Sequence, residues 1–208
     1  VRPFGYDKPQ GVSGEASCIA IVSGHDIHEV KNLTLAVGKD VSGNGALKFG
    51  QVGNSQDVKS GTFRVENLGS DNNFTLLFEQ TSPNNFTFDI NGKSLDARSF
   101  LSAREETPVV SSKPSPAVRI NAKADRIRTG KKENQFVRQA KIFARVDDGE
   151  IHALDLQATA GRGRVALTIK PDSRNTMQLD LTAEDAGETL YAFDVYDNII
   201  GGTLKIRG

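Results

Sequence analysis

The sequence has no tryptophan, one methionine and a single cysteine, Cys18. One cysteine excludes an internal disulfide, so the fold cannot depend on the cross-links that small secreted modules often use. No apolar run approaches the roughly 20 residues that a membrane-spanning helix needs. No leader is recognisable where the sequence opens with Val1. The missing methionine fits initiator removal and leader cleavage equally well, so the compartment stays open.

The sequence also has no excess of charge of either sign. It has 26 basic and 26 acidic residues, with 10 basic and 13 acidic before Val110 and 16 and 13 after it. Nucleic-acid binding normally needs a concentrated basic face, which this mild asymmetry does not supply. We therefore expect no nucleic-acid partner and no membrane contact, whereas opposite charges on the two halves could favour contact between copies.

Alternation of apolar and polar residues is the main pattern that is present, and it predicts β-strands throughout. In the first half, Phe74, Leu76 and Phe78 would share one face of a strand. The tetrapeptide Asn-Asn-Phe-Thr at 72–75 recurs at 84–87, as the two arms of a hairpin would produce. The six strands expected in this half are Ala16–Val22, Val30–Val37, Ala46–Val52, Thr62–Asn67, Phe74–Phe78 and Phe86–Ile90.

The second half predicts seven further strands, which begin near residues 118, 136, 151, 164, 176, 190 and 203. One of them is expected to carry Tyr191, Phe193 and Val195 on one face. Seven strands at this spacing, separated by Asp-Gly and Gly-Gly turns, are typical of an immunoglobulin-like sandwich. A sustained helical period is missing, and only Leu95–Glu106 could form a helical turn or two.

A proline- and serine-rich stretch, Thr107–Pro116, is the best candidate for a domain boundary, because prolines cannot donate to a strand ladder and favour extended backbone. The predicted fold class is all-β, with two tandem immunoglobulin-like sandwiches and an extended N-terminal arm. The expected parts are an arm at 1–15, a first sandwich at 16–106, a linker at 107–117 and a second sandwich at 118–208.

The second half resembles the immunoglobulin-like modules of bacterial and phage surface proteins. The resemblance rests on Phe143–Gly149, a strand ending in an acidic turn, and on Ala183–Gly187 followed by the aromatic-rich Tyr191–Asn198. The cysteine pair and the tryptophan of antibody-type domains are absent. The resemblance implies assembly, adhesion or spacing and no catalysis.

The first half is similar to the immunoglobulin-like domains of cilia and centrosome proteins and their bacterial relatives. It carries Phe-Gly-Gln-Val-Gly-Asn-Ser at 49–55 and Phe-Arg-Val-Glu-Asn-Leu-Gly at 63–69. The spacing of the first glycines is one residue shorter than in that family. This resemblance also implies no catalysis.

Candidate chemical sites are few. His25 and His28 form the only histidine pair, but residues three apart converge on a helix and not on a strand, so a solvated turn is favoured over a metal site. Cys18 lies in an apolar stretch without an evident base or orienting partner, which favours a buried, inert thiol. We expect no catalytic, metal-binding or cofactor-binding residue.

Acidic turns such as Asp147–Glu150, and Asp194 with Asp197, could suggest calcium, but they lack the alternating aspartates of a calcium loop and are ordinary turn chemistry. The basic segment around Arg162 and Arg164 is a candidate contact for an acidic partner, with a solvated hairpin tip as the alternative.

The first eleven residues contain two prolines and two aromatic side chains, Phe4 and Tyr6, that so short a segment cannot bury on itself. They predict either a frayed terminus or an arm that docks on a neighbouring subunit.

The resulting functional hypothesis is a non-catalytic structural or decoration protein of an assembled surface. A phage virion component made in the host cytoplasm fits best, contacting copies of itself or a capsid or tail protein as a homo-oligomer. The alternatives are a secreted or periplasmic bacterial module for adhesion or carbohydrate binding, and an accessory domain pair of a larger enzyme.

Overall fold

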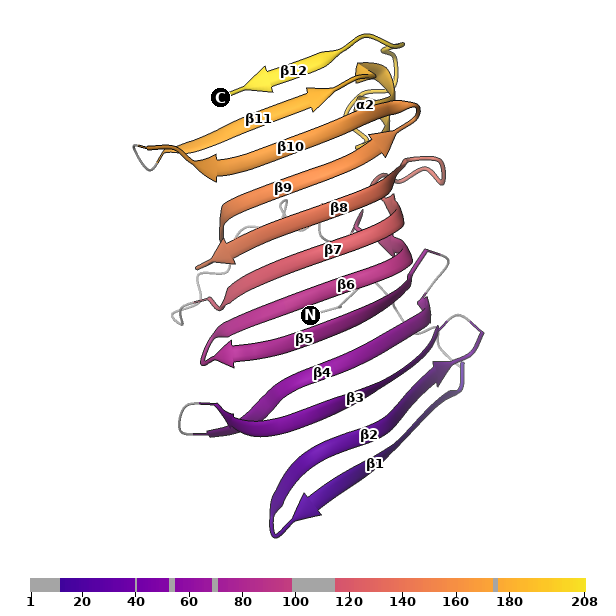
Figure 1. The fold of residues 1–208 in the computed structure, drawn as a ribbon. Helices are drawn as coiled ribbons and strands as arrows, with labels where there is room; N and C mark the ends of the chain where they lie inside the picture. Colours follow the sequence, from indigo (N-terminus) through magenta and orange to yellow (C-terminus); the bar gives the residue numbers. More distant parts are fainter. Residues whose placement is uncertain (1–11, 40, 53–54, 69–70, 99–114, 174–175) are drawn as a thin grey trace.

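The computed structural model describes residues 12–39, 41–52, 55–68, 71–98, 115–173 and 176–208. Twelve strands form one open sheet in which each strand lies beside its neighbour in the sequence (Figure 1). The strands are β1 (Gly14–Ser23), β2 (Asp26–Val37), β3 (Val41–Val52), β4 (Ser55–Leu68), β5 (Asn73–Ser82), β6 (Asn85–Asp96), β7 (Ala117–Arg128), β8 (Phe136–Asp147), β9 (Glu150–Ala160), β10 (Gly163–Pro171), β11 (Met177–Ala183) and β12 (Leu204–Arg207). A short helix, α2 (Ala186–Ala192), follows β11.

The prediction of an all-β chain is confirmed, but the described residues do not form two sandwiches. Every adjacent pair of strands is antiparallel except β6 and β7, which pair in parallel from Asn85 beside Ala117 to Asp96 beside Arg128. This ladder joins the two halves into one sheet. Period-two alternation shows that a strand has one apolar face but does not say which strand pairs with it, so the sequence did not reveal this junction. Most of the predicted linker lies outside the described residues, and the domain bounds stay predictions.

One face of the sheet is apolar from edge to edge. Residues directly opposite each other on paired strands lie on the same face. The register therefore places one row of apolar side chains or glycines across eleven strands, β2 to β12: Leu33, Gly45, Phe63, Leu76, Ile90, Ala122, Ile142, Leu156, Leu167, Leu181 and Ile206. A second row crosses β1 to β11: Ala20, Val30, Leu47, Gly61, Phe78, Phe88, Ile120, Ala144, Leu154, Ile169 and Leu179.

The opposite face is polar along the same strands. One row of this face, directly next to the first apolar row in sequence, contains one alanine and otherwise only polar or charged residues: Ser17, Thr34, Asn44, Arg64, Thr75, Asn91, Lys123, Lys141, Gln157, Ala166, Thr182 and Lys205. The sheet is thus two-sided, with a polar face suited to water and an apolar face that needs a cover.

A bulge changes which residues face the apolar side near one end of the central strands. β8 carries one extra residue relative to β9 at Gln139, which has a positive φ of 51°. β6 likewise gains one residue relative to β5 beside Gly92. An extra residue reverses the alternation beyond it. Leu95, Ile127 and Val137 therefore join the apolar side.

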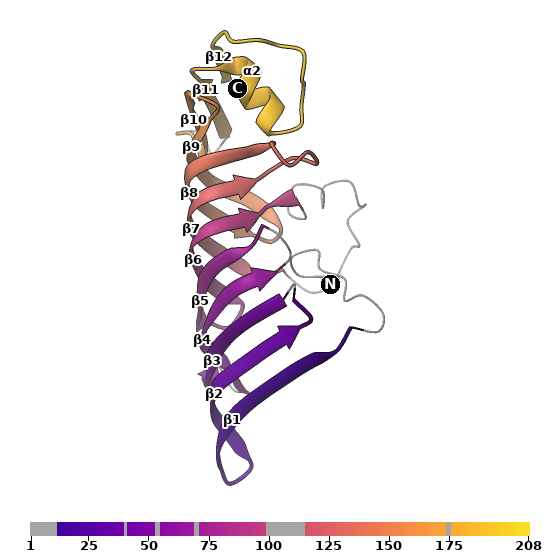
Figure 2. The same cartoon turned by 90° about the vertical axis from the view of Figure 1, so that its right-hand side faces the viewer.

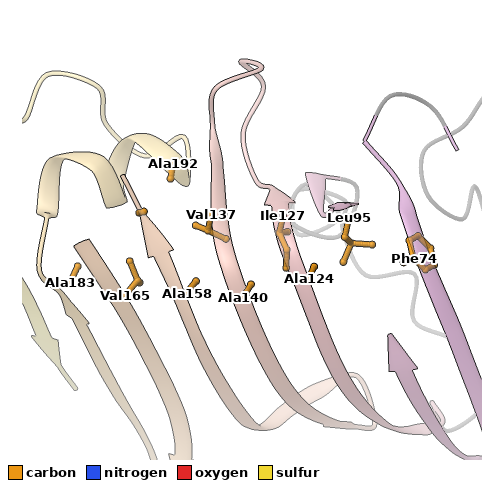
Figure 3. Packing of buried hydrophobic residues seen from close by; sticks show 11 residues of the cluster. Phe74, Leu95, Ala124, Ile127, Val137, Ala140, Ala158, Val165, Ala183 and Ala192 are labelled. Carbon is orange, nitrogen blue, oxygen red and sulfur yellow. The ribbon is translucent and has the colours of Figure 1, made fainter. Parts of the chain in front are cut away.

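The best-buried part of the molecule lies at this end of the sheet. Ile127 and Val137 are 2% and 1% exposed, and they pack in one cluster with small residues of β7 to β11 (Figure 3). α2 packs against β9 and β10 and adds Ala192 to the cluster. The Thr129 hydroxyl donates a hydrogen bond of 2.5 Å to the Ala192 carbonyl, which fixes the helix over this corner.

The prediction of a strand beginning near residue 190 is wrong, because α2 occupies this segment. Asp185 caps α2 by accepting a hydrogen bond of 3.1 Å from the Glu188 backbone N–H. An Asp-x-x-Glu spacing is a helix-start signal. This helix-start signal is present at 185–188. The strand was predicted instead because Tyr191 and Phe193 alternate with polar or small residues.

The sheet bends into a shallow trough. Figure 2 views it along the strands, which bow toward the side on which α2 lies. Because α2 covers part of the apolar face, that face is the concave one. We call the half-buried apolar surface of the two rows the trough.

Candidate ligand-binding trough

The trough is an apolar surface that the described residues leave largely uncovered. In each row, ten of the eleven residues are at least half-buried. Ala122 is the only residue of the two rows that is fully buried. These side chains touch their neighbours within the sheet, but the described chain provides no second sheet over them. A side chain of a packed sandwich core would instead contact both layers and lose nearly all its exposure.

Aromatic rings lie close against glycines in the first half of the trough. A Cβ added at Gly45 would lie 2.7 Å from a ring carbon of Phe63, and one at Gly61 would collide with the ring of Phe78. The Phe63 and Phe78 rings are stacked with their centroids 6.3 Å apart. Rings that occupy the space above a glycine make the surface smooth and leave no deep pocket.

The trough offers a ligand almost no hydrogen-bonding side chain. Both rows consist of aliphatic, aromatic, alanine or glycine positions. The backbone groups between them are engaged in the strand ladders. Sites for sugars, nucleotides and charged metabolites use placed polar groups to fix orientation, and the two rows do not provide such groups. It can bind apolar groups of any length along the sheet.

Among the described residues, Asp96 is the acid with a clearly shifted pKa, and it lies in an ion pair and not in the trough. Burial opposes ionisation of Asp96, but hydrogen bonds from Arg98 and the charges of Arg98 and Arg128 outweigh it and lower the pKa of the Asp96 carboxyl. Asp71 pairs with Arg128 at the same end of the sheet. These pairs anchor the ends of β6 and β7, a structural role.

A hollow of about 830 Å³ lies on the polar face, among the side chains of Lys123, Lys141, Gln157 and Arg164. It is an open surface between long side chains of both signs, since Asp125 also lines it. The side chains of Lys123, Lys141, Gln157 and Arg164 are exposed, so this hollow is a gap between them and not an enclosed site.

The sequence-predicted site residues are not brought together. Arg162 is exposed in the turn between β9 and β10. Arg164 is exposed at the start of β10, where its backbone N–H donates a hydrogen bond of 3.0 Å to Glu184 Oε2. Their partner-binding role stays a prediction. Phe4 and Tyr6 lie outside the described residues.

The other candidates occupy ordinary turns and edges. His25 lies in the turn between β1 and β2 and His28 within β2, and the described residues contain no cluster of three or more His, Cys, Asp or Glu side chains suited to a metal. Asp148 and Gly149 both have positive φ, as a tight Asp-Gly hairpin requires. Cys18 is exposed, so the expectation of a buried thiol is wrong: β1 is the edge strand of a single layer.

An exposed apolar loop after α2 was not foreseen. Val195, Tyr196, Ile199 and Ile200 project there into solvent, and Ile200 is 99% exposed. We call these four residues the apolar hook. The run Val-Tyr-Asp-Asn-Ile-Ile-Gly-Gly at 195–202 resembles a strand followed by a turn. Recognising the capped helix before it would have predicted a loop here.

Comparison with known proteins gives no identification: no family model matches the chain, and neither a curated protein nor a solved structure is significantly similar to it. Within the part of the chain that the structure describes, no helix has the length and apolar character to cross a bilayer.

Proposed function

We propose that this chain is a non-catalytic binding module whose trough holds elongated apolar ligands, with the acyl chains of lipids as the ligand class. The observation that carries the proposal is the pair of uninterrupted apolar rows on an open, concave sheet. Burying apolar surface is favourable by roughly 25 cal/mol per Å². A surface of this extent therefore has a strong tendency to acquire a cover.

The curvature favours acyl chains over a second copy as the cover. Two concave faces brought together meet at their rims and leave a gap between them, which apolar chains would have to fill. The absence of polar side chains in the rows suits a ligand without hydrogen-bonding groups along its length.

The size of the trough also fits. Twelve strands at about 4.8 Å spacing give a sheet on the order of 50 Å long from β1 to β12. An acyl tail spans about 15 Å, half the roughly 30 Å core of a bilayer. Several tails could lie along the trough, while the polar reverse face stays in water.

A fluorescent fatty acid, cis-parinaric acid, tests the proposal directly. We expect saturable binding, and we expect Leu156→Glu to weaken it at least about tenfold, because a carboxylate within the first row must be desolvated by the ligand. Titrations followed by fluorescence measure both affinities.

The matched control is Gln157→Glu, which adds the same charge on the same strand but on the polar face. It should leave the affinity unchanged. Leu156→Ala adds no charge and should weaken binding by a few fold, which keeps the test valid if the glutamate variant does not fold. Absence of saturable binding to the unmodified protein, or equal losses in both glutamate variants, would exclude the trough as the site.

A second candidate function, assembly into a surface structure, is favoured by the edge strand β1. All ten residues of β1 are exposed, Glu15 is its only charged residue, and it has no proline. Natural sheets usually protect such an edge with charges, prolines or bulges, because it can pair with a strand of another chain. The virion, adhesion and immunoglobulin-like assignments all stay predictions under this candidate.

Pairing of two β1 strands from different copies would bring Cys18, near the middle of β1, close to its symmetry mate. We then expect mild oxidation to give a disulfide-linked dimer in high yield, and Ile21→Lys to abolish it, since a lysine on an edge opposes strand addition. Leu77→Lys, exposed on the polar face within the sheet, is the control. A protein that sediments as a monomer at all concentrations and gives no cross-link would rule this candidate out.

A further inference from the structure

The apolar hook is a built feature and not a loose turn. Its base is clamped on one side by backbone hydrogen bonds from Ala186 to Gly202 and from Gly187 to Gly201, of 2.8 and 3.1 Å. On the other side, Gln135 Nε2 donates a hydrogen bond of 2.8 Å to Asp194 Oδ1. The fixed base leaves the tip, residues 195–200, to project from the sheet.

The one charged residue at the tip of the hook is compensated within the protein. Lys132 Nζ lies 3.1 Å from Asp197 Oδ2, and this hydrogen bond raises the pKa of the lysine, so the pair remains charged and neutral in sum. Asp194, at the base, accepts a hydrogen bond from the neutral Gln135 amide and keeps its negative charge. At the tip, residues 195–200, Asp197 is the only charged residue and Lys132 compensates it, so the tip presents apolar side chains without a net charge.

The composition and size of the hook suit a lipid surface. A fully exposed isoleucine beside a second isoleucine, a valine and a tyrosine is an apolar patch with no internal reason to be exposed. Stable protein interfaces bury about 800 Å² on each side, far more than six loop residues present. Tyrosine beside aliphatic side chains is the combination found at the boundary between lipid headgroups and acyl chains.

We propose that the apolar hook inserts into the surface of a lipid bilayer and docks the end of the sheet that carries α2 against it. This inference goes beyond ligand binding by the trough, and it is an alternative to the sequence-based prediction of no membrane contact. It would place the trough next to a source or acceptor of lipid, because the hook follows the helix on the trough side (Figure 2).

The absence of tryptophan from the sequence makes a clean test possible. In an Ile200→Trp variant, the introduced indole should shift its emission to shorter wavelength on addition of phosphatidylcholine vesicles. Dibrominated phosphatidylcholine should quench it. A Met177→Trp variant, with the probe exposed at the opposite end of the strands, should show neither effect.

Vesicle co-sedimentation of the tryptophan-free protein provides the second measurement. Replacing Ile199 and Ile200 together by serine should lower the partition coefficient at least about tenfold, since each isoleucine loses most of its transfer free energy. Leu77→Ser, at an exposed leucine on the polar face of β5, should leave it unchanged. Addition of phosphatidylglycerol should change the partition little, because Lys132 compensates Asp197, the only charged residue of the tip.

Three results would overturn the inference: no sedimentation of the unmodified protein with vesicles, an indole that stays unquenched, or binding that requires anionic lipid and disappears in salt. Loss of vesicle docking with retained parinaric acid binding would remove the hook inference alone. Loss of fatty-acid binding with retained docking would remove the trough alone.

Discussion

Ile127→Ala is expected to lower the free energy of unfolding by about 2–5 kcal/mol, the range for truncating a fully buried isoleucine. Ile127 is 2% exposed and lies in the cluster that joins β7, β8 and α2 (Figure 3). The neighbouring side chains are strand residues held by their ladders, so they can close only part of the resulting cavity. Urea denaturation followed by circular dichroism measures the loss.

Ile120→Ala is the control, because Ile120 lies on the same strand in the trough and is only half-buried. We expect its truncation to cost less than half as much. Equal losses in the two variants would mean that the trough is as tightly covered as the cluster, which would contradict an open apolar face.

Asp71→Ala is expected to cost about 3–5 kcal/mol, as when one partner of a buried ion pair is removed. The side chains of Arg128 and Asp71 are only 11% and 14% exposed, and Arg128 Nε is buried without a hydrogen-bond partner. Loss of the carboxylate leaves the guanidinium to be stabilised by the Lys131 carbonyl, 3.0 Å from its Nη2. The same denaturation experiment measures the change.

Asp180→Ala tests whether burial is the reason. Asp180 pairs with Arg207 at 2.8 Å on the surface of β11 and β12, with 34% and 66% of their side chains exposed. Exposed pairs contribute about 0–1 kcal/mol. A comparable loss in both variants would show that the position within the sheet, and not desolvation of the pair, sets the cost.

Most strands could be predicted from the sequence because their apolar residues alternate. Phe74, Leu76 and Phe78 do share a face, and the repeated Asn-Asn-Phe-Thr does open both arms of the β5–β6 hairpin. Alternation holds equally for a sandwich and for an open sheet. The partner of β6 is decided by the parallel register with β7 across an intervening crossover, which no local pattern encodes.

The trough illustrates the same limit. Leu154, Leu156 and Ile142 follow the period-two alternation, and they lie on the apolar face. The sequence offered no sign that the second layer of a sandwich would be missing from the described residues. The hook was hidden for a different reason: Val195 continued the alternation of Tyr191 and Phe193, although Asp185 had already started a helix.

The arrangement of strands in sequence order has a consequence for how the molecule loses structure. Apart from the β6–β7 step and the contacts of α2, every strand depends on its immediate neighbours in the chain, as units do in a solenoid. Stability in such an array is nearly a sum of nearest-neighbour terms, so disorder can advance strand by strand from an edge. Opening of β1 and β2, whose residues are almost all exposed, sacrifices little apolar packing elsewhere. Amide hydrogens should therefore exchange along a gradient, fastest at β1 and slowest in the strands around Val137.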